Sequence, residues 1–305
     1  MCFIGRYETD SCCDFENESV LNCGKVYAAM NELQKVEFAL LKEFVRICDL
    51  LHLTYYLVCG TALGAAKYNG FIPWDDDIDV ALPRPDYEVF CQKAQDFLPE
   101  HICLQNYRTQ SAYPRIYSKL RDSTTTYIEK TVAHIPMNHG IFIDVFPLDG
   151  YPIQPKEAKR LEKYKRKQKL KIECVFDVDY GWLRNMFFRL ERMVGYHKRT
   201  AALLENLSNR LSQYPTSTSS VWCNHGNWQG KLEYAPREQY GEGAWATFEG
   251  LKVRIPERYD EYLTQKYGDW RADLPPEQQV GHHYYTVMDT KKPYTEYVGM
   301  QQSHQ

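Results

Sequence analysis

The sequence predicts an α/β fold of the α+β type: a mixed sheet with flanking helices, followed by a helical segment and a mixed C-terminal region. Two observations carry this prediction. Between residues 26 and 52 apolar side chains recur at three- and four-residue steps, the period of a helix that buries one face. Short β-rich runs such as residues 54–58 and 140–147 then alternate with helical stretches, an order typical of α/β proteins.

The composition sets bounds on the class of protein. The 305 residues suffice for one large domain or two ordinary ones, and a net charge of −3 gives no reason to expect a nucleic-acid partner. No apolar run approaches the roughly 20 residues of a membrane-spanning helix, and the first residues do not resemble a signal peptide. The ten cysteines form no CxxC pair, so we expect a reducing, cytoplasmic setting.

We expect five segments along the chain. Residues 1–24 are polar and aperiodic, which predicts a loose N-terminal arm. Residues 25–150 hold the alternating helices and strands of a catalytic core, and residues 151–212 form a basic helical segment. Residues 213–290 mix short strands, turns and proline-delimited helices and complete the site, and residues 291–305 form a tail.

The most informative stretch reads Ile-Pro-Trp-Asp-Asp-Asp-Ile-Asp-Val-Ala-Leu and covers residues 72–82. A strand predicted from Asp75 onward places Asp75, Asp77 and Asp79 on one face, because side chains alternate along a strand. Like charges at this spacing repel each other, and a divalent cation bound through oxygen is the simplest way to neutralise them. The sequence therefore predicts a metal site on this strand.

Two other interpretations of the acidic stretch are weaker. A solvated acidic turn does not need the apolar Ile78 and Val80 threaded through it. In an EF-hand calcium loop, Asp75, Asp77 and Asp79 would fall at positions one, three and five, but Val80 occupies position six, where the sharp turn requires glycine.

A fourth carboxylate, Asp144, lies inside the apolar run of residues 141–146. A charge buried in such a strand is costly unless it is paired or metal-bound. If this strand lies beside the acidic one, Asp144 completes a three-carboxylate site with Asp77 and Asp79. An aspartate at a strand end, hydrogen-bonded to a neighbouring loop, is the structural alternative.

Candidate phosphate-binding groups lie before and after the acidic strand. Gly60 and Thr61 stand between a strand and a short helix, where glycine lets a phosphate approach and the helix N-terminus offers free N–H groups. Lys119 and Arg121 share a strand face and could meet a diphosphate, with Arg121 binding in a fork. Lys67 in the short helix is a similar candidate. Ordinary surface charges are the alternative for these cations.

The order strand, Gly-Thr, helix and then Asp-x-Asp is that of the nucleotidyltransferase superfamily. More specifically, the sequence from Cys59 to Asp79 resembles the LicD family, the phosphorylcholine transferases of bacterial surface glycans. Fukutin and its relatives are similar around the same acidic motif, and the resemblance spans roughly residues 30–285. Further motifs that share it are Asp86-Tyr87, Lys119-Leu-Arg121, the run from Gly140 to Asp149, Phe248-Glu-Gly250, Tyr267-Gly-Asp269, Pro275-Pro276 and His282-His283.

The resemblance implies a nucleotidyltransferase-like fold, a CDP-alcohol donor such as CDP-choline, and Mg²⁺, with Mn²⁺ as an alternative ion. It implies transfer of the phosphorylated alcohol, in the first place phosphocholine, to a sugar hydroxyl of a teichoic acid or lipopolysaccharide, with release of CMP. Carried over, Asp77 and Asp79 match the metal-binding pair and Asp144 the third carboxylate, while Asp75 is an additional candidate ligand.

Two departures from the family pattern affect the donor site. The family usually has glycine where Cys59 precedes Gly60, and Arg-His where this chain has Lys67-Tyr68. Arginine and lysine are not interchangeable at a bidentate phosphate contact, so we expect the grip on the donor to differ from the family norm.

The expected mechanism assigns Asp144 as the group that accepts the proton of the attacking sugar hydroxyl. A choline group would need an aromatic or acidic pocket, and Trp74, close to the acidic strand, is the first candidate among many aromatic residues. The alternatives are a nucleotidyltransferase that makes an activated alcohol and releases pyrophosphate, a fukutin-like polyol-phosphate transferase, and an inactive glycan-binding family member.

One charged helix is a candidate membrane contact. From Lys156 to Lys171 the chain carries nine Lys or Arg residues against two Glu. Such a helix could dock electrostatically on the inner face of a membrane or on a lipid-linked glycan acceptor, and an ordinary solvated helix is the alternative. The sequence leaves the oligomeric state open.

Overall fold

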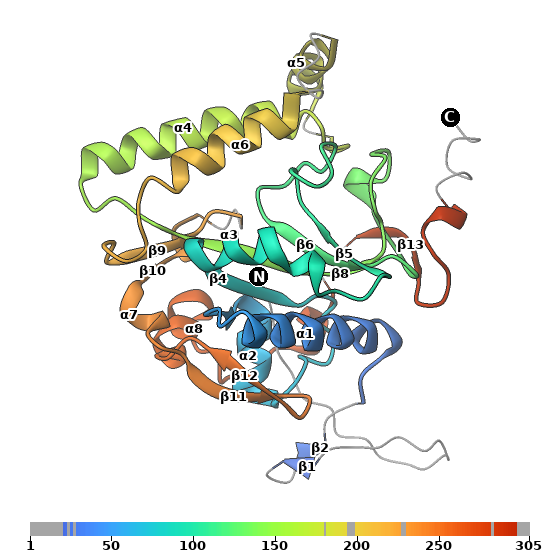
Figure 1. The fold of residues 1–305 in the computed structure, drawn as a ribbon, viewed down its shortest axis with the longest axis vertical. Helices are drawn as coiled ribbons and strands as arrows, with labels where there is room; N and C mark the ends of the chain where they lie inside the picture. The colour runs from blue at the N-terminus through green and yellow to red at the C-terminus, as the bar shows by residue number, and fades with distance from the viewer. Residues whose placement is uncertain are drawn as a thin grey trace.

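The computed structural model of this chain is a mixed α/β fold built on one seven-stranded sheet (Figure 1). Most of the predicted N-terminal arm, the end of the predicted tail and the pair His282-His283 lie outside the residues that the structure describes. Those described are residues 21–22, 25–26, 29–179, 181–193, 199–226, 230–281 and 284–297.

The central strand of the sheet is β8 (Ile141–Gly150), whose ten residues are all buried. One edge of β8 pairs in parallel with β4 (Asp79–Pro83), which pairs antiparallel with β3 (Tyr56–Leu57). The other edge of β8 pairs with β6 (Ser118–Asp122) along its first half and with β9 (Val221–Asn224) along its second half. Two outer strands complete the sheet, β5 (Ile102–Gln105) beside β6 and β10 (Tyr234–Pro236) beside β9.

The acidic segment forms a shorter strand than the sequence predicts. The predicted strand starts at Asp75, whereas β4 starts at Asp79. The N–H of Asp75 donates to the carbonyl oxygen of Ile72 at 2.9 Å, so the chain is still turning there. Consecutive carboxylates are poor strand residues, which explains the late start. Ile78 and Val80, the apolar residues threaded through the acidic stretch, are both fully buried, which argues against a solvated acidic turn.

Two helices cover one face of the sheet. Helix α1 (Glu32–Leu50) packs across β6 and β8, and α3 (Arg84–Lys93) packs across β4 and β8. The helix predicted from residue 26 begins at Glu32, because the side chains and N–H groups of Asn31 and Gln34 satisfy each other in a capping box.

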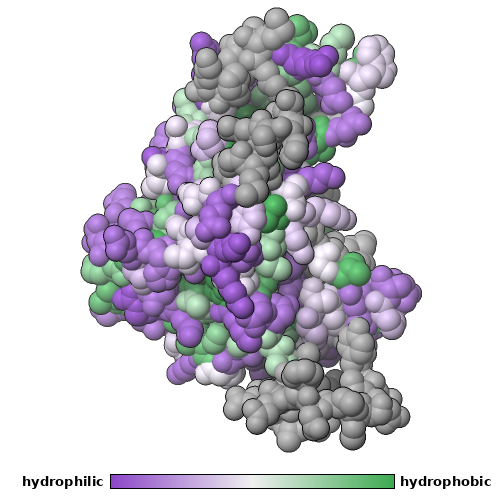
Figure 2. All heavy atoms as spheres, turned by 90° about the vertical axis from the view of Figure 1, so that its right-hand side faces the viewer, coloured by the Kyte–Doolittle hydropathy of each residue, from purple (hydrophilic) through white to green (hydrophobic). Residues whose placement is uncertain are grey.

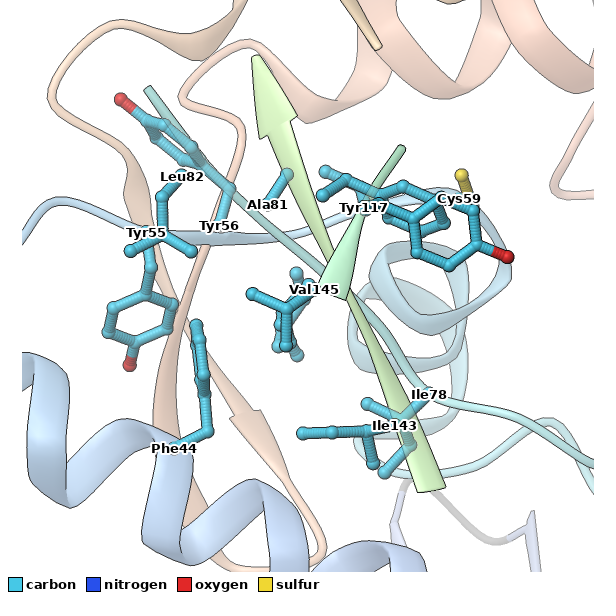
Figure 3. Packing of buried hydrophobic residues seen from close by; sticks show 14 of the residues in the cluster. Phe44, Tyr55, Tyr56, Cys59, Ile78, Ala81, Leu82, Tyr117, Ile143 and Val145 are labelled. Carbon is cyan, nitrogen blue, oxygen red and sulfur yellow. The ribbon is translucent and has the colours of Figure 1, made fainter. Parts of the chain in front are cut away.

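Part of the main hydrophobic core lies between these helices and the sheet, where Figure 3 shows Phe44 of α1 on the same side as Tyr55. The ring of Phe44 lies 5.2 Å from that of Phe90, which joins α1 to α3. Ile143 and Val145 of β8 belong to the same core and are fully buried. Because side chains alternate along a strand, Asp144 between them points to the opposite face of the sheet.

The described residues of the segment predicted to be helical (151–212) include three α-helices. These are α4 (Pro155–Glu173), α5 (Trp182–Met193) and α6 (Thr200–Leu211). Helices α4 and α6 pack against each other at one end of the molecule, and α5 lies beyond them, farthest from the sheet (Figure 1).

The C-terminal region returns to the sheet and to the strand before β8. Helix α8 (Tyr259–Tyr267) is capped at its C-terminus by Gly268, whose φ is 70°. The segment predicted as a tail from residue 291 is attached to the body as far as residue 297, because Tyr294 donates its N–H to Thr125 at 3.0 Å. The elements concerned are α8 (Tyr259–Tyr267), the hairpin β11 (Ala244–Phe248) and β12 (Leu251–Ile255), and β13 (Tyr285–Asp289) paired with β7 (Thr126–Glu129).

The surface is mainly hydrophilic on the face shown in Figure 2, where apolar atoms form small scattered patches. No helix in the described ranges of the chain is both long enough and apolar enough to cross a membrane. The short elements that remain are α2 (Cys59–Tyr68), α7 (Arg237–Tyr240) and the strand pair β1 (Leu21–Asn22) and β2 (Lys25–Val26).

A buried ion pair between α3 and β8 makes a prediction about stability. Arg84 binds Asp149 through two bonds of 2.7 and 2.6 Å, and the Asp149 side chain is fully buried. Replacing Arg84 by alanine leaves that carboxylate unpaired, so we expect Arg84→Ala to lower the free energy of unfolding in urea by about 3–5 kcal/mol. The exposed pair of Arg46 and Glu43 is the control, and Arg46→Ala should cost less than about 1 kcal/mol. Equal losses of unfolding free energy in the two variants would contradict the conclusion that the buried Arg84–Asp149 pair is needed for stability.

Candidate active site

Three functional side chains stand in one row across the sheet. Asp79 of β4 and Asp144 of β8 are register partners, so the acidic segment and the Asp144 strand are neighbours. On the other edge of β8, Lys119 of β6 is also opposite Asp144. Side chains of directly paired residues point to the same face of a sheet, so the three groups project together from the face opposite α1.

Backbone hydrogen bonds fix the position of Asp79. Its N–H donates to Thr61 Oγ1 at 2.8 Å, and its carbonyl oxygen accepts from the N–H of Val58 at 3.0 Å. The N–H of Asp144 donates to the carbonyl oxygen of Ile78 at 2.8 Å, which joins the two acidic segments. The structure thus gives Thr61 a positioning contact with the acidic strand, in addition to its predicted role toward phosphate.

Helix α2 begins at Cys59, three residues earlier than the sequence predicts, and no side chain caps its N-terminus. Gly60 and Thr61 therefore lie in the first turn of a helix, where N–H groups lack partners within the helix and attract anions. Cys59 has a φ of 53°, in the left-handed region that favours glycine, and this accounts for the glycine usual at this position in the family the sequence resembles.

The residues just before β4 form a cluster of carboxylates. Asp75, Asp76 and Asp77 can each offer an oxygen within 4.8 Å of the other two. Burial raises the pKa of Asp75 well above its usual range, and the neighbouring carboxylates of Asp77, Asp76 and Asp79 raise it further. The side-chain amide of Gln34 donates to the carbonyl oxygen of Asp75 at 3.1 Å and ties the cluster to α1. Asp76 was not predicted, because strict strand alternation would have pointed it away.

Asp144 is outside this cluster and is buried, at 5% exposure. The ammonium of Lys119 lies 2.9 Å from Oδ1 of Asp144, but the contact lacks hydrogen-bond geometry, and Oδ1 accepts no hydrogen bond from the residues described. Asp144 is thus a buried carboxylate paired with one ammonium, and carboxylate oxygens are the ligands that hard divalent cations prefer. The residues present therefore fit a hard divalent cation that prefers oxygen ligands.

A group of charged side chains beside Asp144 forms an ionic wall, which consists of Glu129, Arg115, Lys119 and Arg121. Glu129 of β7 is its anionic centre. It lies 2.8 Å from Arg115, 3.2 Å from Arg121 and 3.5 Å from the ammonium of Lys119. Burial lowers the pKa of Lys119 from its ordinary value, although the carboxylates of Asp144 and Glu129 act in the opposite direction. Glu129 was also missed, since its partners become visible only when β6 and β7 are folded together.

Arg121 is a buried member of the ionic wall. Its side chain has no exposed area, and its guanidinium donates to Gln105, to the carbonyl oxygen of Gly140 and to Glu129. A guanidinium with these partners stabilises the wall, and the predicted fork around a phosphate is not supported by this geometry.

Lys67, another predicted phosphate contact, is also bound to groups of the protein. Its ammonium donates to the carbonyl oxygens of Arg271 at 2.9 Å and Ala272 at 2.8 Å, and it lies 3.2 Å from Asp273. These contacts attach α2 to the segment after α8, so the predicted phosphate contact of Lys67 is not supported either. Trp74, the predicted choline contact, is half-buried and packs against the main core.

A cavity of about 210 Å³ lies between the α4–α6 pair and the start of β6. Arg115, Tyr117 and Phe176 line it, and the guanidinium carbon of Arg115 lies 5.4 Å from the Phe176 ring centre. Nε of Arg115 is buried without a hydrogen-bond partner among the described residues. A Cβ on Gly226 would approach Tyr117 to 2.8 Å, so only glycine allows the chain to pack this closely against Tyr117 at the edge of the cavity. The cavity shares Arg115 with the ionic wall beside Asp144.

Residues 52–169 match the family model described as LicD/FKTN/FKRP, nucleotidyltransferase domain. This match and the paired aspartates of the mixed sheet define the class of protein, an enzyme with a nucleotidyltransferase-like core. The chain is 30% identical over 263 residues to the lipopolysaccharide cholinephosphotransferase LicD of Haemophilus influenzae, covering 83% of this chain and 96% of that protein. The chain belongs to the LicD family and is a transferase. An uncharacterized protein of Rickettsia prowazekii is 27% identical over 131 residues, 42% of this chain and 46% of that protein.

The raised pKa of Asp75 makes a prediction about pH. A carboxyl group whose pKa is raised by folding stabilises the folded state below its unfolded pKa of about 4, and this contribution is lost as the pH rises through the folded pKa. In chelator, the melting temperature should therefore fall with rising pH more steeply for the native protein than for Asp75→Asn. Parallel curves for the two proteins would show that Asp75 carries no such strain.

Proposed function

We propose that the protein transfers phosphocholine from CDP-choline to a sugar hydroxyl of a surface glycan and releases CMP. The single observation that carries this proposal is the register pair Asp79 and Asp144, with the Asp75–Asp77 carboxylates directly before it. The likeness to the lipopolysaccharide cholinephosphotransferase LicD supports the transferred group and the glycan acceptor. The proposed setting is reducing and cytoplasmic, since the ten cysteines of the chain form no CxxC pair.

In this proposal Mg²⁺, or Mn²⁺ in its place, is held by Asp77, Asp79 and Asp144, with Asp75 as an additional ligand. The ion supplies positive charge that neutralises the donor diphosphate and the leaving CMP. The raised pKa of Asp75 supports a cation at this place.

In this proposal the residues of the chain bind and orient the substrates, and one of them takes up a proton. Asp144 accepts the proton of the attacking sugar hydroxyl as the new phosphate ester bond forms. Lys119, beside Asp144, contributes positive charge toward the phosphoryl group in transfer. The first turn of α2, with Gly60 and Thr61, is proposed to bind anionic phosphate oxygens at its N–H groups, since no side chain caps that helix end.

The cavity beside the ionic wall is proposed to receive the phosphocholine part of the donor. Arg115 replaces Arg121 as the proposed phosphate contact, because it lines the cavity and its side chain is partly exposed. The rings of Tyr117 and Phe176 offer aromatic faces to a trimethylammonium group.

A product assay tests the proposal. CDP-choline with a glycan acceptor and Mg²⁺ should yield CMP and a phosphocholine-modified glycan. Pyrophosphate formed from CTP and phosphocholine would indicate a nucleotidyltransferase instead. Transfer only from another CDP-alcohol would indicate a polyol-phosphate transferase. Absence of turnover with every nucleotide donor would favour a glycan-binding role.

Substitution of the two paired aspartates should separate their roles. Asp79→Asn should abolish turnover and weaken donor binding, because the cation ligand is lost while the fold remains. Asp144→Asn should retain most donor affinity, lower transfer by roughly 10²–10⁴, and lose the acidic limb of the pH–rate profile, because the proton acceptor is gone. Donor titration and pH–rate profiles on both variants measure this. Loss of donor binding in Asp144→Asn would make that residue primarily a metal ligand.

The two arginines of the ionic wall provide a second separation. Arg115→Ala should raise the KM for the donor with little change in unfolding free energy, because the Arg115 side chain is partly exposed and lines the cavity. Arg121→Ala should instead lower the free energy of unfolding by about 3–5 kcal/mol, since it removes a fully buried guanidinium on which Gln105, the carbonyl oxygen of Gly140 and Glu129 depend as a donor. Steady-state kinetics and urea unfolding on both variants decide the matter, and a reversed pattern would restore Arg121 as the phosphate contact.

A further inference from the structure

Helix α5 presents a continuous apolar stripe to solvent. At about 100° per residue the members of the stripe cover an arc of roughly 140° on one side of the helix. They are Trp182 (74% exposed), Leu183 (61%), Met186 (53%), Phe187 (38%) and Leu190 (56%). Contiguous exposed apolar area of this kind marks an interaction surface.

The opposite side of α5 is attached to the body, which orients the stripe outward. Phe188 is only 3% exposed and belongs to a small core that includes Val132, Ile135 and Val175. The guanidinium of Arg184 pairs with Glu173 at the end of α4. The exposed stripe is therefore the outer face of a packed helix.

Helix α4 carries a second stripe, which is cationic. Its exposed Lys and Arg side chains are spaced at i, i+3, i+4, i+7, i+10 and i+11, so they share one face, while Leu161 and Ile172 are buried on the other. The members are Lys156, Lys159, Arg160, Lys163, Arg166 and Lys167.

The charge of this region is opposite to that of the whole chain. Residues 155–190 hold eleven Lys or Arg and five Asp or Glu, which gives 11 − 5 = +6, whereas the chain carries −3. The five acids include Asp177 and Asp179 in the connection between the helices, so the count already contains the opposing charges. Both helices lie at the same end of the molecule, away from the sheet (Figure 1).

We propose that the α4–α5 surface docks the protein on an anionic phospholipid bilayer. The apolar stripe of α5 lies in the headgroup boundary, where Trp, Phe, Leu and Met side chains leave water. The cationic stripe of α4 and the exposed Arg189 of α5 face lipid phosphates. Charge decides against a second copy of the chain as the occupant, because two surfaces of charge +6 would repel each other. The docking surface does not depend on the identity of the donor.

Vesicle sedimentation with the full chain tests this proposal. The protein should pellet with vesicles of phosphatidylcholine and phosphatidylglycerol but remain in the supernatant with phosphatidylcholine alone, and added salt should weaken the binding. The apolar variant Trp182→Ser with Phe187→Ser, and the charge variant Lys159→Glu with Lys163→Glu, should each lower the partition coefficient on the order of tenfold or more.

Matched controls lie elsewhere on the surface. Trp245→Ser removes a tryptophan that is 53% exposed on β11, and Lys93→Glu reverses an exposed lysine at the end of α3, so both should bind like the native protein. Circular dichroism melts check that α5 remains folded in the apolar variant, and the charge variant tests the proposal independently of that outcome. The proposal is overturned if the native protein ignores anionic vesicles, or if both altered variants bind them as the native protein does. A dimer lost in the apolar variant with vesicle binding unchanged would also overturn it.

Discussion

The parallel pairing of β4 with β8 is the constraint on which the rest of the structure depends. It buries two apolar strand faces against α1 and α3, and the same register places Asp79 directly beside Asp144 on the other face. A shift of the β4–β8 register by one residue would turn the buried side chains of Val80 or Val145 out of the core. The apolar side chains therefore fix the register that keeps Asp79 beside Asp144. The fold therefore uses hydrophobic burial to hold two carboxylates together that would otherwise repel each other.

Those charges are compensated only in part by the protein. Lys119 stands beside Asp144, and Glu129 is surrounded by Lys119, Arg115 and Arg121, so the ionic wall balances its own charges. At Asp75, by contrast, desolvation and the carboxylates of Asp77, Asp76 and Asp79 all raise the pKa. The raised pKa of Asp75 supports the proposed cation, because a bound positive charge favours the ionised carboxylate.

Residues whose role follows from local sequence could be predicted, and residues whose role depends on distant partners could not. Asp144 could be identified from the sequence because it is a charged residue inside the apolar run of β8. Its position beside Asp79 could be expected because both residues lie on strands whose other side chains are mainly apolar. Lys67 and Arg121 looked like free cations because their partners lie elsewhere, about 200 residues away for Lys67 and on three different segments for Arg121. Asp76 was missed because the strand began late, and Arg115 because a cavity has no sequence pattern. The fold class, by contrast, rests on periodicity and is mixed α/β as predicted.

Helix α4 connects the two surfaces on which function is proposed. Its inner side contributes Lys169, Ile172 and Glu173 to the wall of the cavity, and its outer side carries the cationic stripe. Glu173 also pairs with Arg184 of α5, so the last turn of α4 touches both the cavity and the helix that bears the apolar stripe. A glycan anchored in a lipid surface would thus approach the protein along the same helix that borders the proposed donor cavity. This arrangement gives a physical reason for a helix with nine Lys or Arg residues that is nevertheless packed against the core on its other side.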